Sequence, residues 1–402
     1  MALCLANSLI ACQDFVSYDQ LVRYKWWYRH GYMSSTGQCF DIGAATRQSI
    51  EEFETRQRKF AHDHDMPLDE MDLLSDRGLL QAFDVNCSKE GVAGNGALMR
   101  LAPVPLFFYR NPEVAVDYSG ISGRITHGDD KAYDACCYYG ALIIAAMNGA
   151  KKSELTSKTF YDKHREWFGN RSLDPEIMKI AEGSYQKPGG YQDGIRGKGY
   201  IVNALEAALW AFWSDEDSFE TGALKAVNLG DDTDTTAAIY GQLAGAHYGY
   251  KKLPEKWLDC IGQITHGDDK VYDACCYYGA LIVAALDGAK KSDLTSTTFY
   301  EEHRKWFGDR TLHTDIMAIA HGSYQKPGGY QEGIRGKGYI VNALEAALWA
   351  FWSDGDSFEA GALNAVNLGD DTDTTAAIYD IMSLTLRRST RTQASKPHWI
   401  DT

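Results

Sequence analysis

The feature of this sequence that most constrains its fold is a long internal duplication. The segment ITHGDDKAYDACCYYGALI begins at Ile125, and the nearly identical ITHGDDKVYDACCYYGALI begins at Ile264, an offset of 139 residues. The acidic stretch GDDTDTTAAIY at Gly230 returns at Gly369 with the same offset of 139 residues. A repeat this long exceeds the roughly 20 to 50 residue period of solenoid arrays, so a large part of a domain is duplicated.

The duplication divides the chain into parts. Residues 1–124 have no second copy, and after Tyr240 and Tyr379 the two copies diverge. We therefore expect a first domain over residues 1–262, a partial duplicate of residues 124–247 over residues 263–386, and a polar tail over residues 387–402. The composition of that tail predicts disorder.

Helical patterns predominate, and alternation typical of strands is absent, so the sequence predicts an all-α fold. IVNALEAALWAFW, residues 201–213, combines good helix formers with an apolar stripe. Asp217 or Ser218 is the expected N-cap of the next helix, and Gly230 is its expected C-cap. The first segment, MALCLANSLIAC, is predicted to be a core helix whose buried face carries Leu3, Leu5, Ala6, Leu9 and Ile10.

Charge and cysteine content narrow the function classes. The 402-residue chain has a formal net charge of −15, which disfavours nucleic-acid backbones and anionic membranes as partners. No apolar run reaches the roughly 20 residues that span a bilayer. The nine cysteines include two adjacent pairs and no CxxC spacing. This usage is typical of a reducing, cytoplasmic location.

The acidic turn at residues 230–236 has two interpretations. Its Asp and Thr side chains can cap the helix that follows by accepting hydrogen bonds from free backbone N–H groups. Alternatively, carboxylates two residues apart with an adjacent hydroxyl supply the oxygen ligands that Mg²⁺ prefers. An EF-hand is excluded because Ala237 would occupy the position of its turn glycine. A turn this short supplies only part of an octahedral shell.

Several segments together resemble the ADP-ribosylglycohydrolases. These segments are GDDTDTTAAIYGQLAGAHYG, YMSSTGQCFDIGAATR, GNGALMRLAPVPLFF, RITHGDD and GIRGKGYIVNALEAALWAFW. They cover residues 1 to about 260 in the family's order, and the second copy covers a further stretch. The resemblance implies an all-helical fold, a pair of Mg²⁺ ions (Mn²⁺ in some members), and hydrolysis of the glycosidic bond between ADP-ribose and a protein side chain.

The resemblance also implies roles for individual residues. An ADP-ribosylated protein or another ADP-ribose derivative is the implied partner. The implied metal ligands are Asp232, Asp234 and Thr235, and in the second copy Asp371, Asp373 and Thr374. The implied catalytic residues are Asp41, Asp232 and Asp234, and the implied substrate-binding residues are Gly43, Gly94, Asn95, Gly96, His127 and Tyr200.

Plainer interpretations stay open for several of these residues. Gly94 and Gly96 can serve a tight turn, because glycine tolerates positive φ. Tyr200 can belong to the core instead of a cleft, and His127 can bond only to backbone groups. Asp41 lies between Phe40 and Ile42, so its carboxylate needs a partner if it is buried.

One departure from the family pattern bears on activity. In the family, the remaining metal ligands lie in a Thr-Asp-Asp-Thr segment before a helix that resembles MALCLANSLI. No Thr-Asp-Asp occurs in the 402 residues, so we expect an N-terminally truncated chain with half of a binuclear site. Such a chain would hold Mg²⁺ weakly and turn over slowly or not at all. The alternatives are a catalytically inactive ADP-ribose-binding or structural relative, and a gene model that misses its first exon and repeats others.

Overall fold

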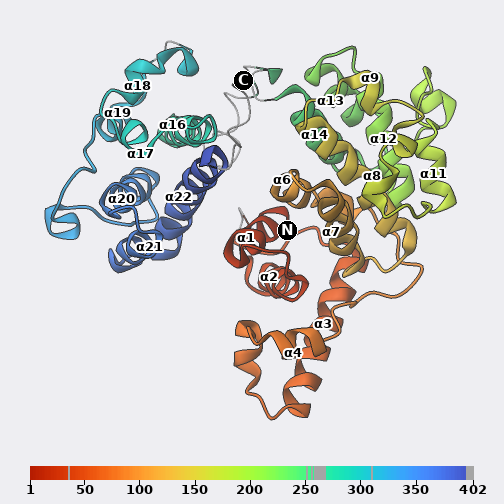
Figure 1. The fold of residues 1–402 in the computed structure, drawn as a ribbon, viewed down its shortest axis with the longest axis horizontal. Helices are drawn as coiled ribbons and strands as arrows, with labels where there is room; N and C mark the ends of the chain where they lie inside the picture. The colour runs from red at the N-terminus through yellow and green to blue at the C-terminus, as the bar shows by residue number, and fades with distance from the viewer. Residues whose placement is uncertain (35–36, 250–251, 255–256, 258–268, 309–310, 395–402) are drawn as a thin grey trace, which may run out of the picture. The chain divides into compact units, whose positions relative to one another are not determined.

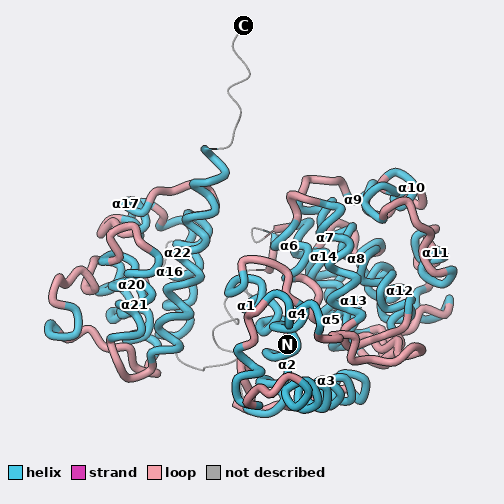
Figure 2. Tube along the Cα trace, turned by 60° about the horizontal axis from the view of Figure 1, so that its bottom comes forward, coloured by secondary structure: helices cyan, strands magenta, loops and turns pink. Residues whose placement is uncertain are grey.

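The computed structural model describes residues 1–34, 37–249, 252–254, 257, 269–308 and 311–394. The chain forms two compact units, Met1–Pro254 and Glu255–Thr402, called unit 1 and unit 2 below. Within the described residues every regular element is a helix, which confirms the all-α prediction (Figures 1 and 2). The division between the units lies at Pro254, upstream of the boundary that the sequence predicts at residue 262.

The first half of unit 1 is the part of the chain without a second copy. Its elements are α1 (Ala2–Cys12), α2 (Ser17–His30), α3 (Ala44–Asp63), the 3-10 helix η1 (Leu68–Leu73), α4 (Arg77–Ala82), α5 (Gly96–Met99), α6 (Pro103–Phe108) and α7 (Pro112–Arg124). Tyr18, Phe53 and Phe83 form an edge-to-face aromatic cluster at its centre, with ring centroids 4.8 to 5.6 Å apart. Such pairs add to the stabilisation that burial alone provides.

The second half of unit 1 is built around one helix. Its elements are α8 (Asp130–Met147), α9 (Lys152–Leu155), α10 (Phe160–Lys163), η2 (Arg165–Phe168), α11 (Pro175–Ala181), η3 (Gly190–Asp193), α12 (Ile201–Trp213), α13 (Phe219–Asn228) and α14 (Thr233–Tyr248). α8 is buried over nearly its whole surface, because its sequence is apolar on all sides. The helices on either side of it therefore share one core.

A buried carboxylate holds the end of this half together. Asp215 is fully buried and forms an ion pair with Lys152. Its carboxylate also accepts hydrogen bonds from the hydroxyls of Tyr240, at 3.3 Å, and Tyr248, at 2.8 Å. A charge this deep is tolerable only when its lone pairs are satisfied in this way.

Unit 2 repeats the second half of unit 1 element by element. Its elements are α16 (Asp269–Leu286), α17 (Lys291–Leu294), α18 (Phe299–Glu302), η5 (Arg304–Phe307), α19 (Thr314–Ala320), η6 (Gly329–Glu332), α20 (Ile340–Ser353), α21 (Phe358–Asn367) and α22 (Thr372–Ala394). The buried carboxylate recurs as Asp354, paired with Lys291 and 3.2 Å from the hydroxyl of Tyr379. Each unit has its own hydrophobic core.

One prediction about local structure needs correction. In α1 the buried residues are Cys4, Leu5, Ser8 and Leu9, whereas Leu3 is 62% exposed, so the buried face is rotated from the predicted one. The helix α22 extends to Ala394, which lies inside the polar segment that begins at residue 387, and disorder of that segment stays a prediction. Residues 395–402 lie outside the described part of the chain.

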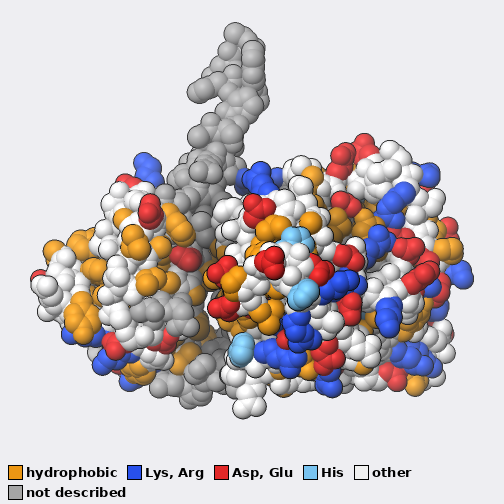
Figure 3. Space-filling view, turned by 90° about the horizontal axis from the view of Figure 1, so that it is seen from below, with side chains coloured by type: hydrophobic (Ala, Val, Ile, Leu, Met, Phe, Trp, Pro, Cys, Tyr) orange, Lys and Arg blue, Asp and Glu red, His pale blue; other side chains and the backbone are white. Residues whose placement is uncertain are grey.

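The distribution of surface charge and the hydropathy of the helices are consistent with the mixed charges and the short apolar runs of the sequence. On the face of unit 1 drawn in Figure 3, acidic and basic side chains are interspersed, so the net negative charge does not form one continuous acidic surface there. None of the described helices is long and apolar enough to cross a membrane.

Candidate functional site

The acidic turn precedes α14, and its backbone is shaped by two residues with positive φ. Gly230 has a φ of 92° and Asp231 a φ of 61°, after which Asp232 stands at the N-cap position. Asp232 makes no side-chain cap to its own helix. Its carboxylate Oδ2 instead accepts a hydrogen bond of 2.6 Å from the side-chain amide of Asn95. The capping interpretation of Asp232 is therefore wrong.

Asn95 belongs to a loop that is fixed to the start of α12. Its backbone N–H donates to the Gly199 carbonyl at 2.9 Å, and the N–H of Ile201 donates to the Ala93 carbonyl at 2.9 Å. This pairing forms an isolated antiparallel bridge between Gly94 and Tyr200. Three segments distant in sequence, residues 93–96, 197–201 and 230–235, thus meet around the carboxylate of Asp232.

Gly197 allows the acidic turn to approach the loop before α12. The Asp232 N–H donates to the Gly197 carbonyl at 2.6 Å, and a Cβ on Gly197 would lie 2.3 Å from Thr236 Oγ1. Any larger residue would push the two segments apart. Gly197 was not among the predicted site residues, although it recurs as Gly336 in the duplicated GIRGKGY segment.

The turn offers three oxygen-bearing side chains of the kind that a hard cation prefers. Asp232 is half-buried, Asp234 is exposed, and Thr235 is buried. The Thr235 hydroxyl donates to the Met99 sulfur at 3.5 Å, and its oxygen lone pairs remain available. The donor set fits Mg²⁺ in chemistry, but it fills only part of a six-coordinate shell. Within the described residues, no group of three or more His, Cys, Asp or Glu side chains could hold a metal ion.

His127 lies behind the glycine loop. It is 1% exposed, and its Nδ1 is 2.9 Å from Thr126 Oγ1. Burial, together with the nearby Arg100 guanidinium, lowers the pKa of His127 to about 3. The imidazole is therefore neutral at physiological pH and contributes no positive charge to an anionic ligand.

The two glycines of the loop make room for this imidazole. Neither Gly94 nor Gly96 has a positive φ, so the tight-turn explanation does not apply. A Cβ on Gly94 would lie 3.2 Å from the His127 ring, and a Cβ on Gly96 would lie 3.4 Å from it. The first turn of α3 also reaches this loop, because Thr46 Oγ1 is 3.4 Å from the same Cβ position on Gly96.

Asp41 and Gly43 lie in the segment that leads into α3. Gly43 is the N-cap of α3, and the backbone of Asp41 has a φ of 47°. The Asp41 side chain is exposed, so burial imposes no need for a partner. The first turn of α3 lies beside the glycine loop, but no hydrogen bond joins Asp41 to the acidic turn among the described residues. A substrate-contacting role for Asp41 stays a prediction.

Tyr200 is half-buried at the edge of the site. Its hydroxyl donates to the Glu176 carboxylate, with Oε2 at 3.2 Å. Burial and the negative charge of Glu176 raise the pKa of Tyr200 to about 12, which keeps the phenol protonated. Lys131 Nζ lies 3.9 Å from the same carboxylate. Glu176 and Lys131 were not among the predicted site residues, since they come from α11 and α8 and share no motif with Tyr200.

The second acidic turn has the same local geometry as the first, but unit 2 has no copy of the segment 93–96 that lies against the first turn. The Asp371 N–H donates to the Gly336 carbonyl, and the Thr375 hydroxyl donates to the Asp371 carbonyl at 3.0 Å. Thr374, however, is exposed where Thr235 is buried, because unit 2 has no copy of residues 1–124. The side chain of Asp373 lies outside the described part of the chain.

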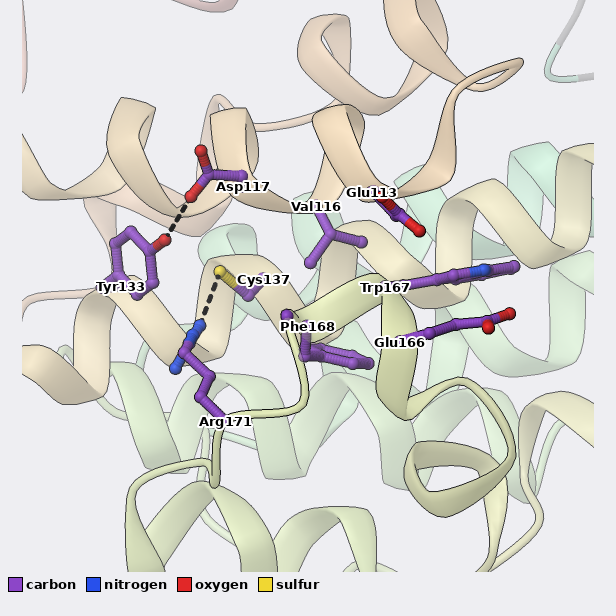
Figure 4. A pocket seen from close by; sticks show the side chains of 10 residues that line it. Glu113, Val116, Asp117, Tyr133, Cys137, Glu166, Trp167, Phe168 and Arg171 are labelled. Carbon is purple, nitrogen blue, oxygen red and sulfur yellow. Dashed lines mark hydrogen bonds between the residues drawn. The ribbon is translucent and has the colours of Figure 1, made fainter.

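A separate cavity of about 290 Å³ lies between α7 and η2, and it contains none of the predicted site residues (Figure 4). In it the Tyr133 hydroxyl donates to Asp117 at 2.6 Å, and Arg171 donates to the Cys137 sulfur at 3.3 Å. Burial raises the pKa of the Cys137 thiol, so this cysteine is not a reactive thiolate. The cavity is distinct from the acidic turn.

Comparison with known proteins identifies the family. The model of the ADP-ribosylglycohydrolase family matches residues 1–262 and, separately, residues 260–379. The chain belongs to the ADP-ribosylglycohydrolase family. The second match covers the duplicated segment, so both copies carry the sequence pattern of these glycohydrolases.

Curated relatives within this family include two ADP-ribosylarginine hydrolases. The chain is 35% identical over 269 residues to ADP-ribosylarginine hydrolase Tri1 of Pseudomonas putida strain GB-1, covering 66% of this chain and 62% of the relative. It is 33% identical over 266 residues to ADP-ribosylarginine hydrolase Tri1 of Serratia proteamaculans strain 568, covering 65% and 62%. The chain thus spans about three fifths of the length of these glycohydrolases.

A solved structure is also similar. The chain is 33% identical to a chain of an ADP-ribosylglycohydrolase-related protein complex, with a TM-score of 0.48 and coverage of 65% of this chain and 74% of that one.

Proposed function

We propose that unit 1 is an ADP-ribosyl hydrolase that cleaves the N-glycosidic bond between ADP-ribose and an arginine side chain of a protein. Membership of the ADP-ribosylglycohydrolase family supports the hydrolase class, and the names of the two Tri1 relatives support arginine as the linkage. An ADP-ribosylated protein is then the partner.

One structural observation carries this proposal. Asp232 stands at a helix N-cap, where a side-chain cap would stabilise the helix by about 1 kcal/mol, yet its carboxylate is held by Asn95 instead. Residues that forgo a locally favourable role tend to mark functional sites. The held carboxylate of Asp232, the exposed Asp234 and the buried Thr235 hydroxyl lie within four residues of one another at the start of α14.

The roles of the chain's own residues follow from this arrangement. As the glycosidic bond breaks, positive charge develops on the ribose, and the Asp232 and Asp234 carboxylates would stabilise that charge. A bound Mg²⁺ or Mn²⁺ would supply Lewis-acid activation of water and a grip on hydroxyl oxygens. Asn95 would keep the Asp232 carboxylate in place, and neutral His127 would support the loop that carries Asn95.

A second candidate function is favoured by the incomplete ligand set. The turn contributes two carboxylates and one hydroxyl, which are too few ligands to bind Mg²⁺ tightly, because this ion gives up its water reluctantly. A relative that binds ADP-ribose without hydrolysing its linkage, or that serves a structural role, would need no further metal ligands.

We also propose that unit 2 arose by duplication of residues 124–247, and that the protein works in the reducing cytoplasm, which its cysteine usage favours.

The test is release of ADP-ribose from an arginine-ADP-ribosylated protein by the purified full chain, with Mg²⁺ and with a chelator. We expect metal-dependent release that is lost in the double variant Asp232→Ala/Asp234→Ala. The matched control is Asp371→Ala/Asp373→Ala, which removes the same carboxylates from unit 2 and should leave release unchanged.

The other outcomes distinguish the two candidates. Binding of ADP-ribose without release, measured by calorimetry on the same preparation, would replace the hydrolase with the binding protein. Release that persists in the chelator and in the Asp232→Ala/Asp234→Ala variant would show that the acidic turn is not the site.

A further inference from the structure

The two copies contain one helix in two environments. α8 and α16 differ only at three positions, where Ala132, Ile144 and Met147 become Val271, Val283 and Leu286. In unit 1 a face of α8 is covered closely by α7. A Cβ on Gly140 of α8 would lie 2.5 Å from Ser119 Oγ, and a Cβ on Gly120 of α7 would lie 2.5 Å from Cys137 Sγ. Small residues on both helices bring the two backbones together.

The same face of α16 is uncovered among the described residues, because unit 2 has no copy of α7. Cys275 is exposed, whereas its counterpart Cys136 is fully buried. A Cβ on Gly279 would meet nothing within 4 Å. Val283 is 39% exposed where Ile144 is fully buried, and Leu286 is 64% exposed where Met147 is already 38% exposed. These four residues, Cys275, Gly279, Val283 and Leu286, are called the α16 face below.

We propose that the α16 face packs against the α16 face of a second copy of this chain. Its residues recur at intervals of four, four and three, which places them in one stripe along the helix as in a coiled-coil seam. In unit 1 this stripe accepts a helix whose contact residues are small, and the α16 face itself carries small residues at Cys275 and Gly279. A second α16 therefore has the shape that this surface accepts.

The helix α7 of a second copy is a poorer occupant. It is already covered by α8 of its own unit, so moving it to α16 would bury one face only by uncovering another. Pairing two α16 helices buries two exposed apolar faces and uncovers nothing. A two-fold interface of this kind uses the same patch on both subunits.

The expected arrangement is antiparallel with Gly279 at the two-fold axis. Antiparallel helices oppose their macrodipoles favourably, and glycine permits the closest approach at the crossing point. A residue four positions before the axis then faces one four positions after it, so Cys275 lies opposite Val283 of the partner. We expect one helix pair to bury less than the roughly 1,200 Å² of a small stable interface, so the dimer should be weak and depend on concentration.

The first experiment is sedimentation equilibrium of the full chain over a wide range of concentration. We expect wild type to pass from monomer to dimer, and Gly279→Arg to remain monomeric at every concentration. A Cβ at this position meets no atom of its own chain within 4 Å, and arginine is a better helix former than glycine, so we expect the fold to be retained. The control Leu363→Arg alters an apolar residue that is 53% exposed on α21 and should dimerise like wild type.

The second experiment tests the register. In Val283→Cys the introduced thiol should form an intermolecular disulfide with Cys275 under mild oxidation, and Cys275→Ser in the same background should abolish that crosslink. A monomeric wild type, or a dimer that survives Gly279→Arg, would overturn the proposal. Dimerisation without the Val283→Cys crosslink would mean that another surface, such as α7 of the second copy, occupies the α16 face.

Discussion

The side-chain amide of Asn95 donates a 2.6 Å hydrogen bond to the carboxylate of Asp232, a residue 137 positions later in the chain. This contact joins the unduplicated half of unit 1 to the acidic turn of the duplicated half. Unit 2 repeats the turn without the unduplicated half, so the relationship exists in unit 1 and has no counterpart among the described residues of unit 2.

Replacing Asn95 should affect both stability and the acidic turn. In Asn95→Ala the Asp232 carboxylate loses a donor, and the free energy of unfolding should fall by about 1.5 kcal/mol, the lower end for a hydrogen bond to a charged group, because Asp232 is only half-buried. Urea unfolding followed by circular dichroism measures the change, and ADP-ribose release should fall with it. Asn364→Ala, which removes a 3.1 Å bond to Ser353 in unit 2, should leave release unaffected. Unchanged release in Asn95→Ala would contradict a positioning role for this amide.

Gly197 should tolerate no side chain. The Cβ of Gly197→Ala would stand 2.3 Å from Thr236 Oγ1, so the loop must shift, at a cost of about 1 to 3 kcal/mol in the free energy of unfolding. Gly199→Ala is the matched control, since a Cβ there meets nothing within 4 Å. Thermal unfolding of the two variants compares them directly. Equal melting temperatures would mean that the acidic turn can move away from α12 without cost.

His127 should make unit 1 sensitive to acid. Its folded pKa of about 3 lies below the value of 6.5 in the unfolded chain, so between these values the unfolded state binds the extra proton. Stability should therefore fall as pH drops through this window, by at most about 1.4 kcal/mol per pH unit from this residue. The free energy of unfolding measured against pH should fall less steeply in His127→Asn than in wild type. Parallel curves would show that His127 titrates normally in the folded protein.

The stability of the fold around buried Asp215 should depend on its ion pair with Lys152. Lys152→Met leaves the carboxylate without its countercharge and should lower the free energy of unfolding by about 3 kcal/mol. The double variant Lys152→Met/Asp215→Asn, which removes the stranded charge as well, should recover part of that loss. Calorimetry of the single and double variants separates the two effects. A single variant as stable as wild type would mean that solvent reaches Asp215.

Local sequence was sufficient to predict part of the fold. The predicted helix over residues 201–213 agrees with α12 at both ends, and Ser218, one of the two predicted N-caps, accepts a hydrogen bond from the Thr221 N–H at 3.2 Å. Helix propensity and capping act between residues a few positions apart, so they can be read from adjacent letters. The motifs of the acidic turn and the glycine loop also identified the family correctly.

Contacts between distant segments were not predictable in the same way. The buried face of α1 was assigned wrongly because the residues that a helix buries depend on its partners, and the sequence does not state which helices those are. Asn95 was recognised as part of a loop, but its bond to Asp232 follows from the pairing of residues 93–95 with 199–201. The approach of Glu176 and Lys131 to Tyr200 likewise depends on how distant segments pack, which the sequence does not state.

The duplication separates what the sequence determines from what the tertiary structure decides. Nearly identical letters give the same helix in α8 and α16, because backbone hydrogen bonding and side-chain propensity are local properties. Yet Cys136 is buried and Cys275 is exposed, and Thr235 is buried where Thr374 is exposed. Burial depends on which other segments pack against a helix, and residues 1–124 are present once. The sequence determined the helices and the side chains of the acidic turn, and the tertiary structure decided that the turn of unit 1 lies against the loop that carries Asn95.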